Sequence, residues 1–113
     1  MITGLGIDLV DIGRIAKVLH RTPNLVEKFN IERKGKVTPT DLAQNIAALE
    51  ALYKALPIEK RREIRQYRLS HNSEGAPTIE RLNEKNIWEN QEKIRVSVTH
   101  EGESLIAIVI IES

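Results

Sequence analysis

Two carboxylates in this sequence stand where their chemistry needs an explanation. Asp8 lies inside the apolar and glycine run 4–10, and burying a carboxylate there without a partner would cost roughly several kcal/mol. Glu50 borders the apolar stripe of a helix, about 40° from Ile46 on a helical wheel, where it can reach a neighbouring strand. Two carboxylates near a sheet edge repel each other unless a hard cation lies between them, so the pair predicts a Mg²⁺ site. For Asp8, the alternatives are a basic partner or a strand-end side chain that points to solvent.

Two further residues could act on an anionic substrate. Lys54 follows Glu50 by one helical turn and would add a compact positive charge. The alternative is an i,i+4 surface pair with Glu50, worth only about 0.2–0.5 kcal/mol. His100 begins the turn of a hairpin, where a histidine is most often polar surface, and the same alternative holds for His20 and His71.

A strand and a long helix must position these residues. A strand over 2–10 puts Asp8 on one face with Gly4 and Gly6, which leave room for a ligand or another backbone to approach closely. The helix starts at Thr38 as cap, with Pro39 at its first position, and runs to Leu56 before Pro57. Its apolar residues recur at spacings of 4, 3, 4 and 3: Leu42, Ile46, Leu49, Tyr53 and Leu56.

The remaining segments predict an α+β fold with a mainly antiparallel sheet packed against the one long helix. The sequence predicts a helix over 11–20, a polar connection over 24–37, a charged connection over 58–62, a strand over 64–70, a turn over 71–77, a short strand over 78–80, a short helix or loop over 82–90, and a hairpin of 94–99 with 104–111. The last strand is apolar on both faces, which indicates a central strand or a subunit interface.

Composition narrows the class of protein. A length of 113 residues favours a single domain over 1–113, and the net charge of +1 gives no global bias toward nucleic acid. The basic runs 33–36 and 60–65 leave a small nucleic-acid binder as a weaker alternative, without an aromatic stacking platform. Cysteine is absent, and no apolar run reaches the roughly 18 residues of a membrane helix. We therefore expect a cytoplasmic protein that binds neither nucleic acid nor membrane.

Four ordered blocks resemble the holo-[acyl-carrier-protein] synthases, the small trimeric 4′-phosphopantetheinyl transferases. The blocks are the opening MITGLGIDLVDIGRI at 1–15, the helix AALEALYKAL at 47–56, the turn NSEGAP at 72–77 and the hairpin strand VSVTH at 96–100. They resemble the family's G-I-D opening strand with its R-I helix start, its A-A-K-E-A-x-x-K-A-L helix, its N-x-x-G-x-P turn and its S-hydrophobic-S-H hairpin.

The resemblance implies an α+β phosphopantetheinyl transferase fold, a homotrimer with active sites at subunit interfaces, and a role in fatty acid biosynthesis. It implies coenzyme A as donor and a serine of apo acyl carrier protein as acceptor. Asp8 and Glu50 match the family's Mg²⁺ ligands, and Glu50 is the expected base for the serine proton, directly or through a metal-bound water. Lys54 matches a lysine at the coenzyme A phosphates, and His100 a histidine near the nucleotide. Arg14 matches an arginine that faces the carrier protein.

The chain departs from the family pattern around the coenzyme A phosphates. Leu49 and Ala76 stand where the family has lysines, and 44–46 lacks the usual arginine–aromatic pair. Pro57-Ile58-Glu59 follows the helix where a glycine-rich turn is usual. These departures motivate a second hypothesis, that the chain is a catalytically reduced member acting as a carrier-protein binding module.

Overall fold

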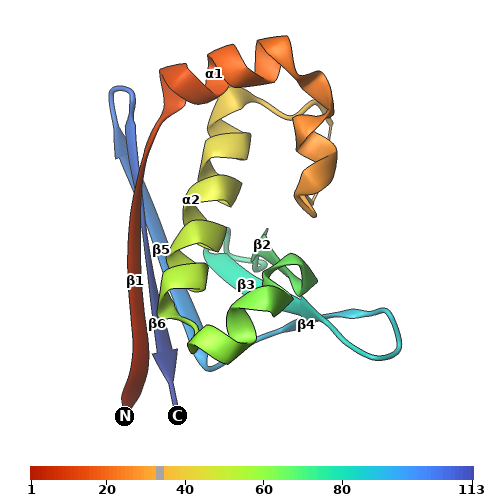
Figure 1. Cartoon of the computed structure of the whole chain (residues 1–113), viewed down its shortest axis with the longest axis vertical. Coiled ribbons are helices and arrows are strands. Elements are labelled where there is room, and N and C mark those ends of the chain that lie inside the picture. Colours follow the sequence, from red (N-terminus) through yellow and green to blue (C-terminus); the bar gives the residue numbers. More distant parts are fainter. Residues whose placement is uncertain (33–34) are drawn as a thin grey trace.

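The structure, a computed structural model, describes residues 1–32 and 35–113. Its elements are β1 (Ile2–Asp11), α1 (Ile12–Arg21), the 3₁₀ helix η1 (Pro23–Lys28), α2 (Pro39–Ala55), the 3₁₀ helix η2 (Ile58–Gln66), β2 (Tyr67–His71), β3 (Pro77–Leu82), β4 (Trp88–Asn90), β5 (Ile94–Glu101) and β6 (Ser104–Glu112). They form two antiparallel three-stranded sheets, ordered β1-β6-β5 and β2-β3-β4. Figure 1 shows α2 along the first sheet and α1 across the upper end of α2. The predicted α+β class with antiparallel pairing is confirmed.

The long helix forms where its capping signals place it. The Thr38 backbone N–H donates to the Asp41 carboxylate (3.0 Å), and the Asp41 N–H donates back to the Thr38 hydroxyl (3.1 Å), which completes a capping box. Pro39 occupies the first turn, and the helix ends at Ala55, two residues before Pro57. α2 therefore has a fixed start and end, and the carboxylate of Glu50 lies in its second half.

Glycines on β1 and alanines on α2 bring the two backbones into contact. A Cβ atom on Gly4 would lie 2.2 Å from the Ala55 carbonyl oxygen, and one on Gly6 would lie 1.8 Å from the Ala51 carbonyl oxygen. Both alanines are buried. The small face of β1 thus admits another backbone, one of the two possibilities the sequence allowed, and Asp8 continues that face of the strand.

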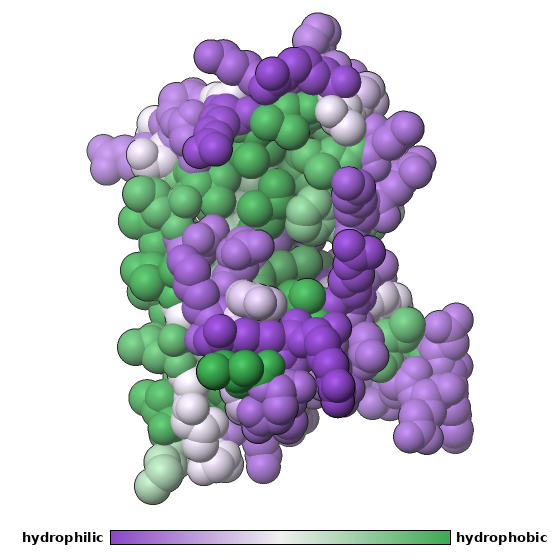
Figure 2. Space-filling view, viewed as in Figure 1, coloured by the Kyte–Doolittle hydropathy of each residue, from purple (hydrophilic) through white to green (hydrophobic). Residues whose placement is uncertain are grey.

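The opposite face of the first sheet is apolar and exposed. Three cross-strand pairs of β1 and β6 share it: Leu5 with Ile110, Ile7 with Ile108 and Leu9 with Ile106. The three β1 side chains are 65%, 54% and 65% exposed. Figure 2 shows apolar surface along the edge of the molecule where β1 lies. β6 is the central strand, as its apolar faces predicted.

Three sequence predictions need correction. Residues 88–90, expected in a helix or loop, form β4, where Trp88 lies under the Arg68 guanidinium at 4.4 Å from the ring centroid. The strand expected over 64–70 begins only at Tyr67, because η2 extends through Gln66. The connection expected over 24–37 includes η1, and its residues 33–34 lie outside the described part of the chain. Within the described residues, no helix is long and apolar enough to span a membrane.

Candidate functional site

Asp8 is held by Lys54. The Lys54 ammonium lies 3.1 Å from an Asp8 carboxylate oxygen and 3.0 Å from the Ile7 carbonyl oxygen. The Asp8 side chain is 17% exposed and that of Lys54 51%, so Asp8 does not simply point to solvent. In this structure the partner of Asp8 is therefore a basic group, which is one of the alternatives that the sequence allowed. The alternative i,i+4 pair is wrong, because Lys54 contacts β1 instead of Glu50.

The atoms around the Lys54 ammonium suit a hard cation. They are a carboxylate oxygen and a backbone carbonyl oxygen, the ligand types that Mg²⁺ and Ca²⁺ prefer. β1 is an edge strand of its sheet, so a ligand can approach this part of the chain from outside the sheet. The ammonium stands in for such a cation, and the donor set therefore fits the predicted metal.

Glu50 is exposed on α2 and lines a cavity of about 260 Å³. It lies one helical turn before Lys54, so Glu50 and Asp8 both border the same stretch of α2. The described residues contain no direct contact between the two carboxylates and no group of three or more His, Asp or Glu side chains arranged for a metal. A cation held here would need waters or substrate oxygens to complete its coordination.

Lys28 and Arg65 line the cavity with Glu50, and sequence reasoning missed them. Lys28 ends η1 and Arg65 lies near the end of η2, so only folding brings them to α2. The Asn30 side chain donates to the Arg65 backbone carbonyl (2.8 Å) and ties the two segments together. The only sequence signal was the charged stretch after Pro57, which resembles ordinary solvated surface.

Tyr67 closes the inner side of the same cavity. Burial raises the pKa of its phenol above the ordinary value, although the nearby Arg81 guanidinium partly lowers it. The side chain therefore stays neutral at physiological pH and presents a hydrogen-bonding group, not a charge.

The predicted turn after β2 borders a second cavity, of about 480 Å³. The Asn72 side-chain oxygen accepts from the backbone N–H groups of Glu74 (2.9 Å) and Ala76 (3.0 Å), and Gly75 takes a φ of 83°. Asn45, within the segment 44–46 that lacks the usual arginine–aromatic pair, also lines this cavity. Its side-chain oxygen is buried and has no hydrogen-bond partner.

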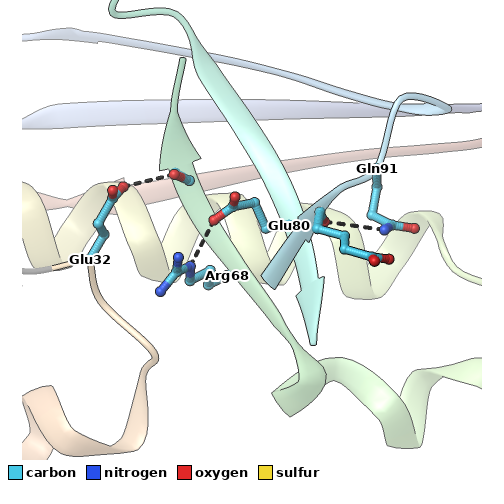
Figure 3. A network of polar contacts seen from close by, with 6 residues as sticks. Glu32, Arg68, Glu80 and Gln91 are labelled. Carbon is cyan, nitrogen blue, oxygen red and sulfur yellow. Dashed lines mark hydrogen bonds and ion pairs between the residues drawn. The ribbon is translucent and has the colours of Figure 1, made fainter. Parts of the chain in front are cut away.

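A separate polar network holds the second sheet in place. The Ser70 hydroxyl donates to the Glu32 carboxylate at 2.7 Å, and Arg68 pairs with Glu80 at 2.8 Å (Figure 3). The paired charges of Arg68 and Glu80 neutralise each other, and Arg68 also stacks on Trp88. These contacts fasten the segment after η1 to β2 and shape the second cavity.

Arg14 and His100 are exposed and contact neither Asp8 nor Lys54 among the described residues. Arg14 lies on α1, which Asp11 caps by accepting from the Arg14 backbone N–H at 2.8 Å. With Lys17 and Arg21, also exposed, it forms a basic stripe at helical spacing. His100 lies on β5 and lines another cavity, of about 540 Å³.

The curated proteins that resemble this chain in sequence share one name. The chain is 32% identical over 119 residues to the holo-[acyl-carrier-protein] synthase of Kocuria rhizophila, covering 100% of this chain and 94% of that protein. It is 36% identical over 121 residues to the synthase of the same name from Treponema pallidum, covering 99% and 97%. No family model matches the chain.

Solved structures share the fold. The holo-[acyl-carrier-protein] synthase of Neisseria meningitidis superposes with a TM-score of 0.73 at 21% identity, covering 100% of both chains. That of Helicobacter pylori, solved in complex with coenzyme A, superposes with a TM-score of 0.71 at 24% identity, covering 96% of this chain and 99% of that one.

Proposed function

The chain belongs to the holo-[acyl-carrier-protein] synthases, and we propose on this premise that it transfers 4′-phosphopantetheine from coenzyme A to a serine of an apo acyl carrier protein. The observation that carries the proposal is the full-length similarity to enzymes of that name. The pairing of Asp8 with Lys54, one helical turn after Glu50 on α2, supports it, because these are the residues that match the family's motifs.

In the proposed reaction, the serine oxygen forms a bond to the phosphorus that carries pantetheine. The pyrophosphate P–O bond breaks, and adenosine 3′,5′-bisphosphate leaves with the electron pair. Glu50 accepts the serine proton: its carboxylate is exposed, lines a cavity and is free of ion pairs among the described residues.

Asp8 and Glu50 are the proposed holders of Mg²⁺, with the Ile7 carbonyl as a further oxygen ligand. When bound, Mg²⁺ would neutralise charge that builds on the phosphoryl oxygens. Lys54 supplies a cation beside the same phosphates, and His100 contacts the nucleotide. Lys28 and Arg65, which line the cavity of Glu50, could compensate for the phosphate-binding residues absent from this chain.

The basic stripe of Arg14, Lys17 and Arg21 on α1 is the proposed docking surface for the acidic carrier protein. Long-range attraction of this kind raises the rate of encounter and weakens with salt. Docking on this surface would bring the carrier's serine to the active site. The proposed reaction serves fatty acid biosynthesis and takes place in the cytoplasm.

A homotrimer is the proposed assembly. The exposed apolar pairs of β1 and β6 support it, because an apolar sheet face of this kind commonly marks a subunit interface. His100 lies apart from Asp8 and Lys54 within one chain, which is compatible with an active site that two subunits share.

Mass measurement of the carrier tests the transfer. The protein, coenzyme A, Mg²⁺ and apo carrier are incubated together, and the carrier should gain one phosphopantetheine. Glu50→Ala should lower the rate at least about 100-fold, the lower range of acid–base effects. Asp8→Ala should also lower it, because it removes a proposed ligand of Mg²⁺. Glu92→Ala, an exposed carboxylate before β5, is the matched control and should transfer normally. No mass gain with the wild-type chain would refute the activity.

The absence of the usual arginine–aromatic pair from 44–46, where Asn45 instead lines the second cavity, favours one other function, a carrier-protein binding module. Calorimetry separates the two. Carrier binding without coenzyme A binding would support the module, whereas tight binding of coenzyme A would exclude it.

A further inference from the structure

The Lys54 ammonium occupies the place on Asp8 that a metal ion would need. It lies 3.1 Å from one carboxylate oxygen of Asp8, Oδ1, and 3.0 Å from the Ile7 carbonyl oxygen. A cation bound to Asp8 and the ammonium of Lys54 would repel each other at that separation. The ammonium therefore covers one of the two Asp8 carboxylate oxygens and weakens the binding of a second cation to the other.

Lys54 is able to leave this position. Its side chain is 51% exposed, whereas that of Asp8 is 17% exposed, so the lysine is the partner with space to change its rotamer. Its backbone belongs to α2, one turn after Glu50, and the four-carbon stem can turn toward the open side of that helix. Movement of the ammonium alone would open the Asp8 oxygens without displacing β1.

We propose that Lys54 is an internal counterion that competes with the divalent cation for Asp8, so that metal binding and release of Lys54 are one exchange. The inference rests on the metal site of the proposed function. In the metal-free chain, the ammonium neutralises Asp8 and is held away from substrate. Metal binding frees it to contact the phosphates of coenzyme A, so metal and coenzyme A strengthen each other's binding reciprocally.

Metal titration without coenzyme A tests the competition. In Lys54→Met, which keeps the apolar stem and removes the charge, Mn²⁺ detected by electron paramagnetic resonance should bind about two- to fivefold more tightly than in wild type, the range that an ion pair of this exposure gives. Lys93→Met removes the same charge from an exposed lysine before β5 and should change the affinity less than about twofold. Equal effects of the two variants, or no Mn²⁺ binding by any of them, would overturn the exchange.

The reactivity of the amine gives a second readout. Acetylation of Lys54 in the wild-type chain, followed by peptide mass spectrometry, should accelerate when Mg²⁺ is added, while that of Lys93 stays constant. In Asp8→Asn, Lys54 should react fast with or without Mg²⁺. If the acetylation rate of Lys54 is the same with and without saturating Mg²⁺, the proposal is overturned. Because neither measurement uses the carrier, a failure of phosphopantetheine transfer would be seen separately.

Discussion

Replacing Gly6 by alanine should force β1 away from α2. The added Cβ would lie 1.8 Å from the Ala51 carbonyl oxygen, 2.9 Å from the carbonyl carbon and 3.1 Å from the Ala55 backbone nitrogen. All three are backbone atoms, so no side-chain rotation can relieve the overlap, and the strand must retreat by more than about 1 Å in a closely packed interior. Overpacking of this kind costs about 1–3 kcal/mol, and we expect the upper end because both partners are backbone.

Urea unfolding and calorimetry measure the effect. A loss of about 3 kcal/mol in a chain of this size corresponds to a fall in melting temperature of roughly 10–20 °C. Gly13→Ala is the matched control: the close approach of its Cβ is to the flexible end of Glu103, at 2.9 Å, its distance to the Asp11 carboxylate is an ordinary 3.5 Å, and alanine favours the helix by up to about 1 kcal/mol. The control should be neutral or stabilising. A Gly6→Ala protein within about 0.5 kcal/mol of wild type would refute the need for backbone contact at this position.

Three further changes probe other parts of the molecule. Thr38→Ala removes the side-chain cap of α2 and should lower the free energy of unfolding by about 1 kcal/mol in urea titrations; an unchanged midpoint would contradict the cap. Folding raises the pKa of Tyr67 above its unfolded value of 10.0. The contribution of this residue to the free energy of unfolding is therefore fully present below pH 10.0 and is lost as the pH rises through the folded pKa. Tyr67→Phe should therefore lose stability less steeply than wild type as the pH rises above about 10, and parallel curves would exclude this role. Ile7→Asp should reduce the mass in light scattering to that of one chain, and an unchanged oligomer would place the interface elsewhere.

The long elements of the fold could be predicted because their signals are local. Thr38 and Asp41 bound α2 at one end and Pro57 at the other; the helix begins after its Thr38 cap as expected and ends at Ala55, one residue before the expected Leu56. β4 could not be predicted in this way. A three-residue strand shows no alternation, and Trp88 is fixed by stacking on Arg68, a contact between distant segments.

The candidate site was predictable only in part, for the same reason. A carboxylate in an apolar strand had to find a partner, and Asp8 finds one in Lys54. Lys28 and Arg65 carry no periodic pattern, and they reach the cavity of Glu50 only because two 3₁₀ helices turn them toward α2. The metal roles of Asp8 and Glu50 remain predictions that the titrations above address.

The pairing of β1 with β6 also sets the order in which the chain can fold. These strands join the two ends of the sequence: Ile2 lies opposite Glu112, and the Ser113 N–H donates to the Met1 carbonyl at 2.8 Å (Figure 1). The β5–β6 hairpin closes a short loop, whereas every β1–β6 hydrogen bond closes a loop that contains the rest of the chain. During synthesis, β1 therefore emerges from the ribosome well before β6 and cannot pair until that strand has followed. We expect slow folding for the chain's size, with the docking of β1 as the late step.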